Sequence, residues 1–413
     1  MVRGCVSNPR TGIIWLNMSY VSTRGGAVPV DFTEAMVTGL APDGGLFVPE
    51  TIPMLPVDWV DWDYETAVSR VLEMYGAADT EHLVKEAAAQ FHHADVAPVV
   101  EVGDRLVLEL FHGPTLSFKD HAMQVVARLL SREVGEGLIL GATSGDTGSA
   151  AVEAFRGIDG LKVVILYPDG GVSDFQRRQM TTVPDGNVQA VAVRGTFDDC
   201  QRMVKEAFAH DPRLLAVNSI NWARVAAQAG FHVCAAARIG EPFDVVIPSG
   251  NFGNVYSCWL AKQMGASIET ITIANNANHG LSDLVNTGVM PETRVVPTRA
   301  PAMDIQVPSN LERFTADPAQ EFRASWSDDR QIGETIGLVA TRHNYRIDPH
   351  TATAWRAGDE ARTERPLQVV ATAHPSKFDD SIPPPDWYPS LAGLEERVVT
   401  IDPETSDLAH LLR

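Results

Sequence analysis

The feature that most constrains the fold of this chain is a repeated succession of apolar segment, glycine-containing turn and helical pattern between residues 137 and 275. The segments GLILGAT, LKVVILYP, VQAVAVRG, FDVVIPSG and SIETITIAN are rich in Val, Ile and Leu, and helical patterns such as SAAVEAF and FDDCQRMVKEAF lie between them. Strands with near-continuous apolar runs are typical of parallel sheets that helices cover on both faces. The succession therefore predicts an α/β fold with parallel sheet.

Length and composition limit the remaining possibilities. With 413 residues, the chain is too long for one compact core, so we expect two or three domains. A formal net charge of −20 argues against nucleic acid or an anionic membrane as the main partner. The four cysteines have no C-x-x-C spacing, which predicts neither a disulfide framework nor a metal site and favours a reducing, cytoplasmic location. No apolar run approaches the roughly 18 residues of a membrane-spanning helix.

One glycine-rich turn, PSGNFGN, follows the strand-like segment that ends near Pro248 and precedes a helical pattern. Gly250 and Gly253 allow a sharp turn that brings backbone N–H groups against a ligand, and the following helix adds its positive end. The turn is neither a Walker loop nor a G-x-G-x-x-G motif. It is either an anion cradle, most naturally for phosphate, or a plain tight turn.

A second turn, ATSGDTGSAA, offers the hydroxyl groups of Thr143, Ser144 and Thr147 at the start of a helical pattern. Hydroxyls and free N–H groups at a helix N-terminus suit the carboxylate of a small substrate. The alternative is that Ser144 or Asp146 simply caps the helix.

A single lysine, Lys119, stands in FHGPTLSFKDHAMQVVARLL. Ser117 and Asp120 read as a capping box, so Lys119 is expected in the first turn of the helix, where the dipole disfavours an ammonium group. A lysine held neutral is a nucleophile towards carbonyl groups, whereas the alternative is a surface lysine that reaches solvent. Together, the lysine and the two turns supply what pyridoxal phosphate needs, namely an amine for its aldehyde, a substrate site and a phosphate site.

Longer motifs carry a family resemblance. FHGPTLSFKD, ATSGDTG, PSGNFGN, PAMDIQVPSN, NSINWARVAAQ, IDPHTATAW and ATAHPSKF, with MSYVSTRG and GLAPDGGLFVPETIP near the N-terminus, resemble threonine synthases of the longer, bacterial–fungal type. The resemblance covers residues 18 to about 380. It implies a fold type II pyridoxal-phosphate enzyme, similar to tryptophan synthase β, with two parallel-sheet α/β domains and a small N-terminal domain.

The resemblance also implies domain limits. We expect an extension without fixed structure over residues 1–17, with Met18 as the working start, and an N-terminal domain over residues 18–95. Residues 96–125 and 240–413 are expected to form the large cofactor-binding domain, and residues 126–239 the smaller α/β domain.

Site residues follow from the resemblance position by position. Lys119 is implied to form the Schiff base with the cofactor and Thr372 to face its pyridine nitrogen. The other implied cofactor contacts are Gly250, Asn251, Phe252, Gly253, Asn254 and Asp146. The implied substrate contacts are Thr143, Ser144, Gly145, Thr147, Arg224 and Lys377, the last two as candidates for the substrate phosphate.

The implied reaction converts O-phospho-L-homoserine and water into L-threonine and phosphate, in a monomer or homodimer. Two departures from the family pattern concern the phosphate: Gly171 stands where a basic residue is expected, and NANHGLSDLV replaces a helix resembling NDILTRF. They leave open a divergent enzyme that acts on another γ-substituted amino acid or releases 2-oxobutyrate. A non-enzymatic cofactor carrier is disfavoured by the intact SFKD, SGDTG and GNFGN motifs.

Overall fold

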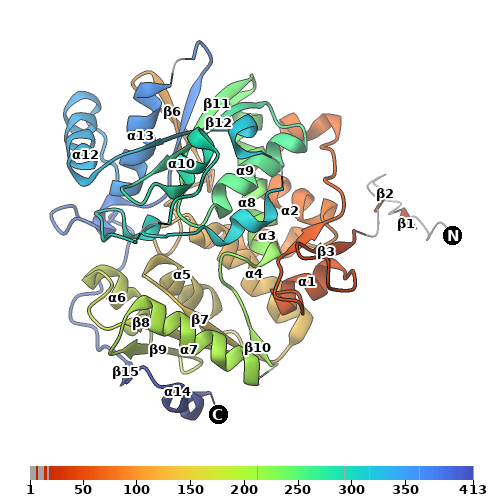
Figure 1. Cartoon of the computed structure of the whole chain (residues 1–413), viewed down its shortest axis with the longest axis vertical. Helices are drawn as coiled ribbons and strands as arrows, with labels where there is room; N and C mark the ends of the chain where they lie inside the picture. Colours follow the sequence, from red (N-terminus) through yellow and green to blue (C-terminus); the bar gives the residue numbers. More distant parts are fainter. Residues whose placement is uncertain are drawn as a thin grey trace.

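The computed structural model of the chain describes residues 6–7, 14–15, 18–211, 213–292, 294–315, 317–361 and 363–412. Two sheets dominate it, and Figure 1 shows them one above the other with helices between them. Of the expected extension over residues 1–17, only the antiparallel pair β1 (Val6–Ser7) and β2 (Ile14–Trp15) is described, and the rest lies outside the described residues.

The larger sheet has six strands in the order β13-β12-β11-β14-β6-β5. All neighbours are parallel except the antiparallel pair β5 and β6. Helix α13 packs on its central strands, and α9 packs on β12. The strands are β5 (Val99–Val102), β6 (Arg105–Glu109), β11 (Phe243–Pro248), β12 (Ile268–Asn275), β13 (Phe322–Trp326) and β14 (Leu367–Ala371).

The smaller sheet has five parallel strands in the order β10-β7-β8-β9-β15. Helix α5 packs on β8, and α7 packs on β7 and β8. Only Lys162 is exposed along β8, as expected for a strand covered on both faces. The strands are β7 (Gly137–Ala142), β8 (Leu161–Pro168), β9 (Val188–Val193), β10 (Leu214–Leu215) and β15 (Val398–Ile401).

The N-terminal part contributes the antiparallel pair β3 (Tyr20–Ser22) and β4 (Phe47–Pro49) and a group of helices that pack against α4 and α8. The α-helices are α1 (Phe32–Thr38), α2 (Tyr64–Met74), α3 (Glu81–Ala88), α4 (Lys119–Val134), α5 (Asp146–Phe155), α6 (Asp174–Thr181), α7 (Phe197–His210), α8 (Trp222–Ile239), α9 (Gly253–Gln263), α10 (Gly280–Thr287), α11 (Pro318–Glu321), α12 (Asp329–His343), α13 (Pro349–Glu360) and α14 (Thr405–Leu411). The 3₁₀ helices are η1 (Val57–Asp61), η2 (Pro301–Met303), η3 (Ser309–Arg313) and η4 (Pro375–Lys377).

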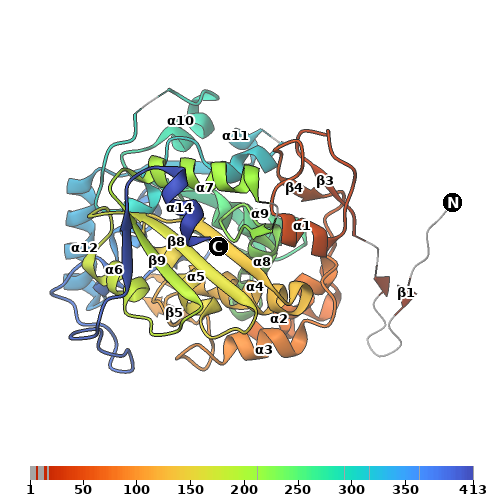
Figure 2. The ribbon, with the colours of Figure 1, turned by 90° about the horizontal axis from the view of Figure 1, so that it is seen from below.

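The expected architecture of two α/β sheets with a separate N-terminal part is confirmed. The expected domain limits place residues 240–413 in the large domain, but the last strand of that range lies in the smaller sheet. This strand, β15, pairs with β9. Helix α14 follows β15 and lies next to the smaller sheet in Figure 2. Within the described residues, no helix is long and apolar enough to cross a membrane.

Candidate active site

The site is built where strands of both sheets reach their carboxyl ends, the usual place for ligands in parallel α/β folds. Lys119 is the first residue of α4, and Asp146 is the first residue of α5, directly after β7 and its turn. The Lys119 Nζ atom donates a hydrogen bond of 2.9 Å to Asp146 Oδ2. This bond joins the helix that follows β6 in the large sheet to the helix that follows β7 in the small one.

The start of α4 differs from the expected capping box. The helix begins at Lys119 behind Phe118, which makes no side-chain cap, and the Ser117 hydroxyl has no partner among the described residues. Asp120 instead accepts hydrogen bonds from Thr115 N at 2.8 Å and Thr115 Oγ1 at 2.6 Å. The capping box was therefore wrong, because the Phe118 N–H donates to the carbonyl oxygen of Thr372 and Ser117 bridges to Ala373, so the chain becomes helical only afterwards.

Asp146 is the centre of a buried polar network. Its carboxylate accepts hydrogen bonds from Lys119 Nζ and, at 2.8 Å, from Gln176 Nε2. Its Oδ1 atom also lies 3.2 Å from Lys377 Nζ. Burial by itself would raise the pKa of Asp146, but Lys119 and Lys377 outweigh it and hold the pKa well below its usual range. The ionised form of Asp146 is thus stabilised by the two lysine side chains that it contacts.

Lys377 lies in η4 and its side chain is completely buried. Besides Asp146, it donates to Gln179 Oε1 at 2.7 Å and to the carbonyl oxygen of Thr115. Burial lowers its pKa. Lys377 therefore belongs to the network around Asp146, and its Nζ atom already has three acceptors.

Sequence reasoning missed Gln176 and Gln179, which lie on α6 and hold Asp146 and Lys377. The start of α6 could have been predicted from the sequence, because Ser173 and Gln176 in the stretch SDFQ form a capping box. The capping box predicts a helix start there, but nothing in the sequence marks the partner to which Gln176 donates.

The turn between β7 and α5 is shaped by Thr143 and Gly145. The Thr143 hydroxyl accepts from Gly145 N at 3.0 Å and from Gly148 N at 2.8 Å. Gly145 is the N-cap with φ of 138°, and a Cβ atom there would lie 2.5 Å from the Gln176 amide. The alternative in which Ser144 or Asp146 caps the helix is wrong, and the Ser144 and Thr147 hydroxyls donate no hydrogen bond to the described residues.

The second turn lies between β11 and α9. Gly250 is packed so closely that a Cβ atom would lie 2.5 Å from the carbonyl oxygen of Ala302. Phe252 is the N-cap in the left-handed region with φ of 63°, a conformation that is uncommon for a residue other than glycine. Within the described part of the chain, the N–H groups of residues 250–253 donate no hydrogen bond.

Two asparagines fix this turn from behind. The carbonyl oxygen of Asn251 accepts from Asn310 N, and Asn254 Oδ1 is 2.7 Å from His232 Nε2. The Asn254 Nδ2 atom and the Ser249 hydroxyl are buried without a partner among the described residues. Free N–H groups, an orphaned amide and the N-terminus of a helix together form an anion cradle.

Thr372 and Arg224 complete the expected set, with different outcomes. Thr372 follows β14, beside β11 and β6 in the sheet, and its backbone is bonded to Phe118 at the start of α4. Arg224 is 2% exposed, donates to the carbonyl oxygen of Val217 and has no acidic partner among the described residues. Burial lowers the pKa of Arg224 to about 10. Thr372 thus lies next to the start of α4, where Lys119 is located. Arg224 is buried on α8 and is bonded to the protein backbone.

Comparisons with known proteins agree with this geometry. Residues 101–374 match a family model described as pyridoxal-phosphate dependent enzyme, and residues 19–87 match one described as threonine synthase N terminus. The chain is 38% identical to the threonine synthase of Pseudomonas aeruginosa, over 88% of this chain and 90% of the relative. It is 36% identical to threonine synthase-like 2 of Xenopus laevis, over 88% of this chain and 90% of the relative. Among solved structures, it is similar to the pyridoxal-phosphate-bound threonine synthase of Brucella melitensis, with a TM-score of 0.89, 37% identity, and coverage of 96% of this chain and 98% of that one.

Proposed function

Because the chain belongs to the threonine synthase family of fold type II pyridoxal-phosphate enzymes, we propose that it converts O-phospho-L-homoserine and water into L-threonine and phosphate. The observation that carries the proposal is the hydrogen bond between Lys119 Nζ and Asp146. It forms at the carboxyl end of the large sheet, the same end at which the free N–H groups before α9 lie. A lysine amine, a fixed carboxylate and an anion cradle are the parts that this chemistry requires.

Pyridoxal phosphate is the cofactor of this family, and the residues present fit it. The four N–H groups of residues 250–253 and the orphaned Asn254 amide would hold its phosphate. A side chain larger than that of Gly250 would push the turn away from Ala302 and spoil the cradle. Thr372 would offer a hydroxyl to the pyridine nitrogen, and Lys119 would offer its amine to the aldehyde.

When bound, pyridoxal phosphate supplies an aldehyde that captures an amine and a ring that draws electron density from the substrate Cα. Lys119 Nζ would accept the proton that leaves Cα, and the proton that leaves Cβ would depart with the phosphate as the Cγ–O bond breaks. Lys119 Nζ would pass its proton to Cγ. When the hydroxyl group of water adds at Cβ, Nζ would take the remaining water proton and deliver it to Cα. Asp146 favours Nζ as the proton acceptor throughout, because its ionised carboxylate stabilises the ammonium form.

The substrate carboxylate is assigned to the turn before α5. The Ser144 and Thr147 hydroxyls donate to no described residue, and Thr143 shapes the loop by accepting from Gly145 and Gly148. The free N–H groups at the start of α5 add positive partial charge. These groups would orient the substrate so that Cα faces Lys119.

The residues expected around the leaving phosphate favour a second candidate function. Lys377 and Arg224 are buried and engaged with protein atoms. Gly171 is exposed and offers no charge. His279, the N-cap of α10, has its Nδ1 atom 2.9 Å from Asp283 Oδ2. These departures favour an enzyme for another γ-substituted amino acid, or one that releases 2-oxobutyrate.

Product analysis with O-phosphohomoserine separates the two functions. The holoenzyme is incubated with this substrate, and phosphate, threonine and 2-oxobutyrate are measured together. The proposal predicts equal amounts of phosphate and threonine, and loss of both in Lys119→Ala. Phosphate accompanied by 2-oxobutyrate, or cofactor bound with no phosphate released, would establish the second candidate.

We further propose a cytoplasmic monomer or homodimer. The buried, free cysteines Cys200, Cys234 and Cys258 support a reducing compartment. Sedimentation of the purified chain at several concentrations would decide the oligomeric state.

A further inference from the structure

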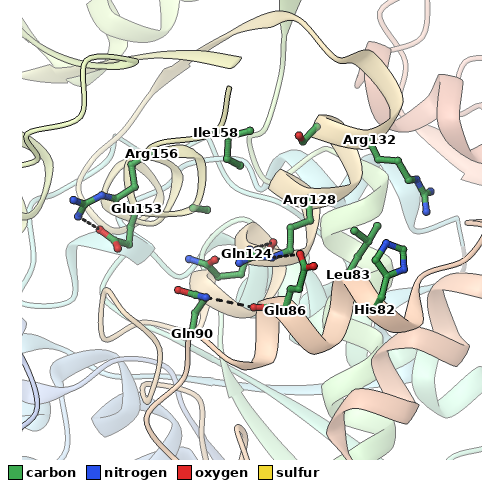
Figure 3. Close-up of a pocket in the computed structure, with 12 residues that line it drawn as sticks. His82, Leu83, Glu86, Gln90, Gln124, Arg128, Arg132, Glu153, Arg156 and Ile158 are labelled. Atoms are coloured by element: carbon green, nitrogen blue, oxygen red, sulfur yellow. Dashed lines mark hydrogen bonds and ion pairs between the residues drawn. The ribbon is translucent and has the colours of Figure 1, made fainter. Parts of the chain in front are cut away.

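A pocket of about 630 Å³, lined by none of the site residues described above, lies between α3, α4 and α5 and the turn that follows α5 (Figure 3). Its volume lies in the range of roughly 300–1,000 Å³ that is usual for small-molecule sites. Its polar lining includes Glu86 from α3, Gln124 and Arg128 from α4, and Glu153 from α5. None of these residues takes part in the reaction proposed for Lys119.

Hydrogen-bond donors are left over in this pocket. Gln124 is 3% exposed, and its Oε1 atom accepts from Arg128 Nη1 at 2.8 Å, but its Nε2 atom donates to none of the described residues. Arg128 donates from Nη1 alone, while its Nε atom lies 3.8 Å from Glu86 Oε2, too far for a hydrogen bond. A nearly buried amide and a half-buried guanidinium with free N–H groups form a receptor for a carboxylate.

The two other arginines of the pocket are already satisfied. Arg132 donates to the carbonyl oxygens of Ala78 and Asp79 and to Glu133. Arg156 donates to Asp185 at 2.8 Å and to Glu153 at 3.2 Å. The anionic group of a ligand is therefore expected at Arg128 and Gln124.

One acidic side chain, Glu86, lies beside Arg128 and completes the proposed receptor. Glu86 is 63% exposed, and its carboxylate lies 3.8 Å from Arg128 Nε, so one cation receptor adjoins one anion receptor. This separation suits an α-amino acid, whose carboxylate and ammonium groups share one carbon atom. Apart from His82 the lining has no aromatic ring on which a nucleobase could stack. We propose that the pocket binds a free α-amino acid, with its carboxylate on Arg128 and Gln124 and its ammonium group on Glu86.

The location of the pocket gives such a ligand a route to the reaction. Gln124 and Arg128 lie on the helix that begins with Lys119, and Glu153 lies on the helix that begins with Asp146. A ligand that contacts α3, α4 and α5 would change the position of α4 relative to α5. This would change the geometry of the hydrogen bond between Lys119 on α4 and Asp146 on α5. We therefore expect the bound amino acid to change the rate at saturating substrate.

Calorimetric titration of the borohydride-reduced holoenzyme tests the proposal, because reduction prevents amino acids from reacting with the cofactor. The probes are L-threonine, L-alanine, L-glutamate and, as an anion without an ammonium group, inorganic phosphate. We expect at least one amino acid to bind more tightly than phosphate. Arg128→Met should weaken it by about 10-fold to 100-fold, the loss expected for charge-assisted hydrogen bonds.

Two further variants make the result decisive. Arg132→Met is the matched control and should bind as the wild type does, because Arg132 has other partners. Glu86→Gln, at an exposed position that tolerates change, should also weaken the amino acid. Failure of all three amino acids to bind, equal binding by Arg128→Met, or phosphate bound as tightly as the amino acids would overturn the proposal. The activity with O-phosphohomoserine is measured separately, so failure here does not touch the proposed function.

Discussion

At the scale of single residues, the site depends on one carboxylate between two ammonium groups. Asp146→Asn should remove the carboxylate that Lys119 and Lys377 share and lower the free energy of unfolding by about 3–5 kcal/mol, the cost of breaking a buried ion pair. The matched control is Asp174→Asn, because Asp174 is also the first residue of a helix but is exposed. Urea unfolding measures both, and equal losses in the two variants would contradict this reading.

Whereas the pKa of Asp146 is lowered, the pKa of Asp120 is raised, and this predicts a pH dependence of stability. Burial raises its pKa to about 6, although hydrogen bonds from Thr115 oppose the rise. With an unfolded value of about 3.9, the folded state binds the proton more tightly between these two values. The contribution of Asp120 to the free energy of unfolding is therefore largest below about pH 4. It falls by about 3 kcal/mol as the pH rises to about 6.

The variant Asp120→Asn removes this titration. The difference in unfolding free energy between wild type and Asp120→Asn should fall from pH 4 to pH 6 and then level off. Denaturant unfolding at pH 4, 5, 6 and 7 measures it. A difference that is constant, or that grows with pH, would show that the Asp120 pKa is not raised.

At the scale of the elements, the turn before α9 is controlled by the space around Gly250. Gly250→Ala would place a Cβ atom 2.5 Å from the carbonyl oxygen of Ala302, so the turn must shift. We expect cofactor affinity to fall by about tenfold or more, as for about 1.4 kcal/mol of lost phosphate contacts. Titration of the apoenzyme with pyridoxal phosphate measures this.

A matched glycine gives the control. Gly337 lies in α12 with open space where a Cβ atom would stand. Gly337→Ala should leave cofactor affinity unchanged and raise the free energy of unfolding by about 0.5–1 kcal/mol, because alanine favours the helix. If both variants kept wild-type cofactor affinity, the turn would not be the phosphate cradle.

The elements also show what the sequence could predict. The apolar segments marked strands β7, β8, β9, β11 and β12, and the position of Lys119 in the first turn of α4 is confirmed. The capping box at Ser117 failed because a long-range bond between Phe118 and Thr372 sets where the helix starts. Local patterns determine which segments are helical, whereas contacts between distant segments decide their ends.

At the scale of the whole molecule, the C-terminal segment closes back onto the site. Glu396 accepts from Arg177, Arg178 and Thr181 on α6, the helix whose Gln176 and Gln179 hold Asp146 and Lys377. Strand β15 follows directly and pairs with β9. No periodicity in the sequence marks this return, because β15 is remote in sequence from the sheet that it joins.

Removing the contacts between Glu396 and α6 should lower both the stability and the activity of the protein. Glu396→Ala should lower the free energy of unfolding by about 1–3 kcal/mol, as for hydrogen bonds to a charged group, and reduce kcat because α6 loosens. Glu395→Ala, at the neighbouring exposed residue, is the matched control and should change neither. Thermal unfolding and steady-state rates decide, and identical behaviour of the two variants would contradict the proposed coupling.

We infer that Lys119, rather than Lys377 on the other side of Asp146, carries the cofactor. The most direct test is borohydride reduction of the holoenzyme, followed by digestion and mass spectrometry of the peptides. We predict a phosphopyridoxyl group on Lys119 in the wild type and no stable label in Lys119→Ala. A label on Lys377, or an unlabelled Lys119 in a protein that holds the cofactor, would contradict the account.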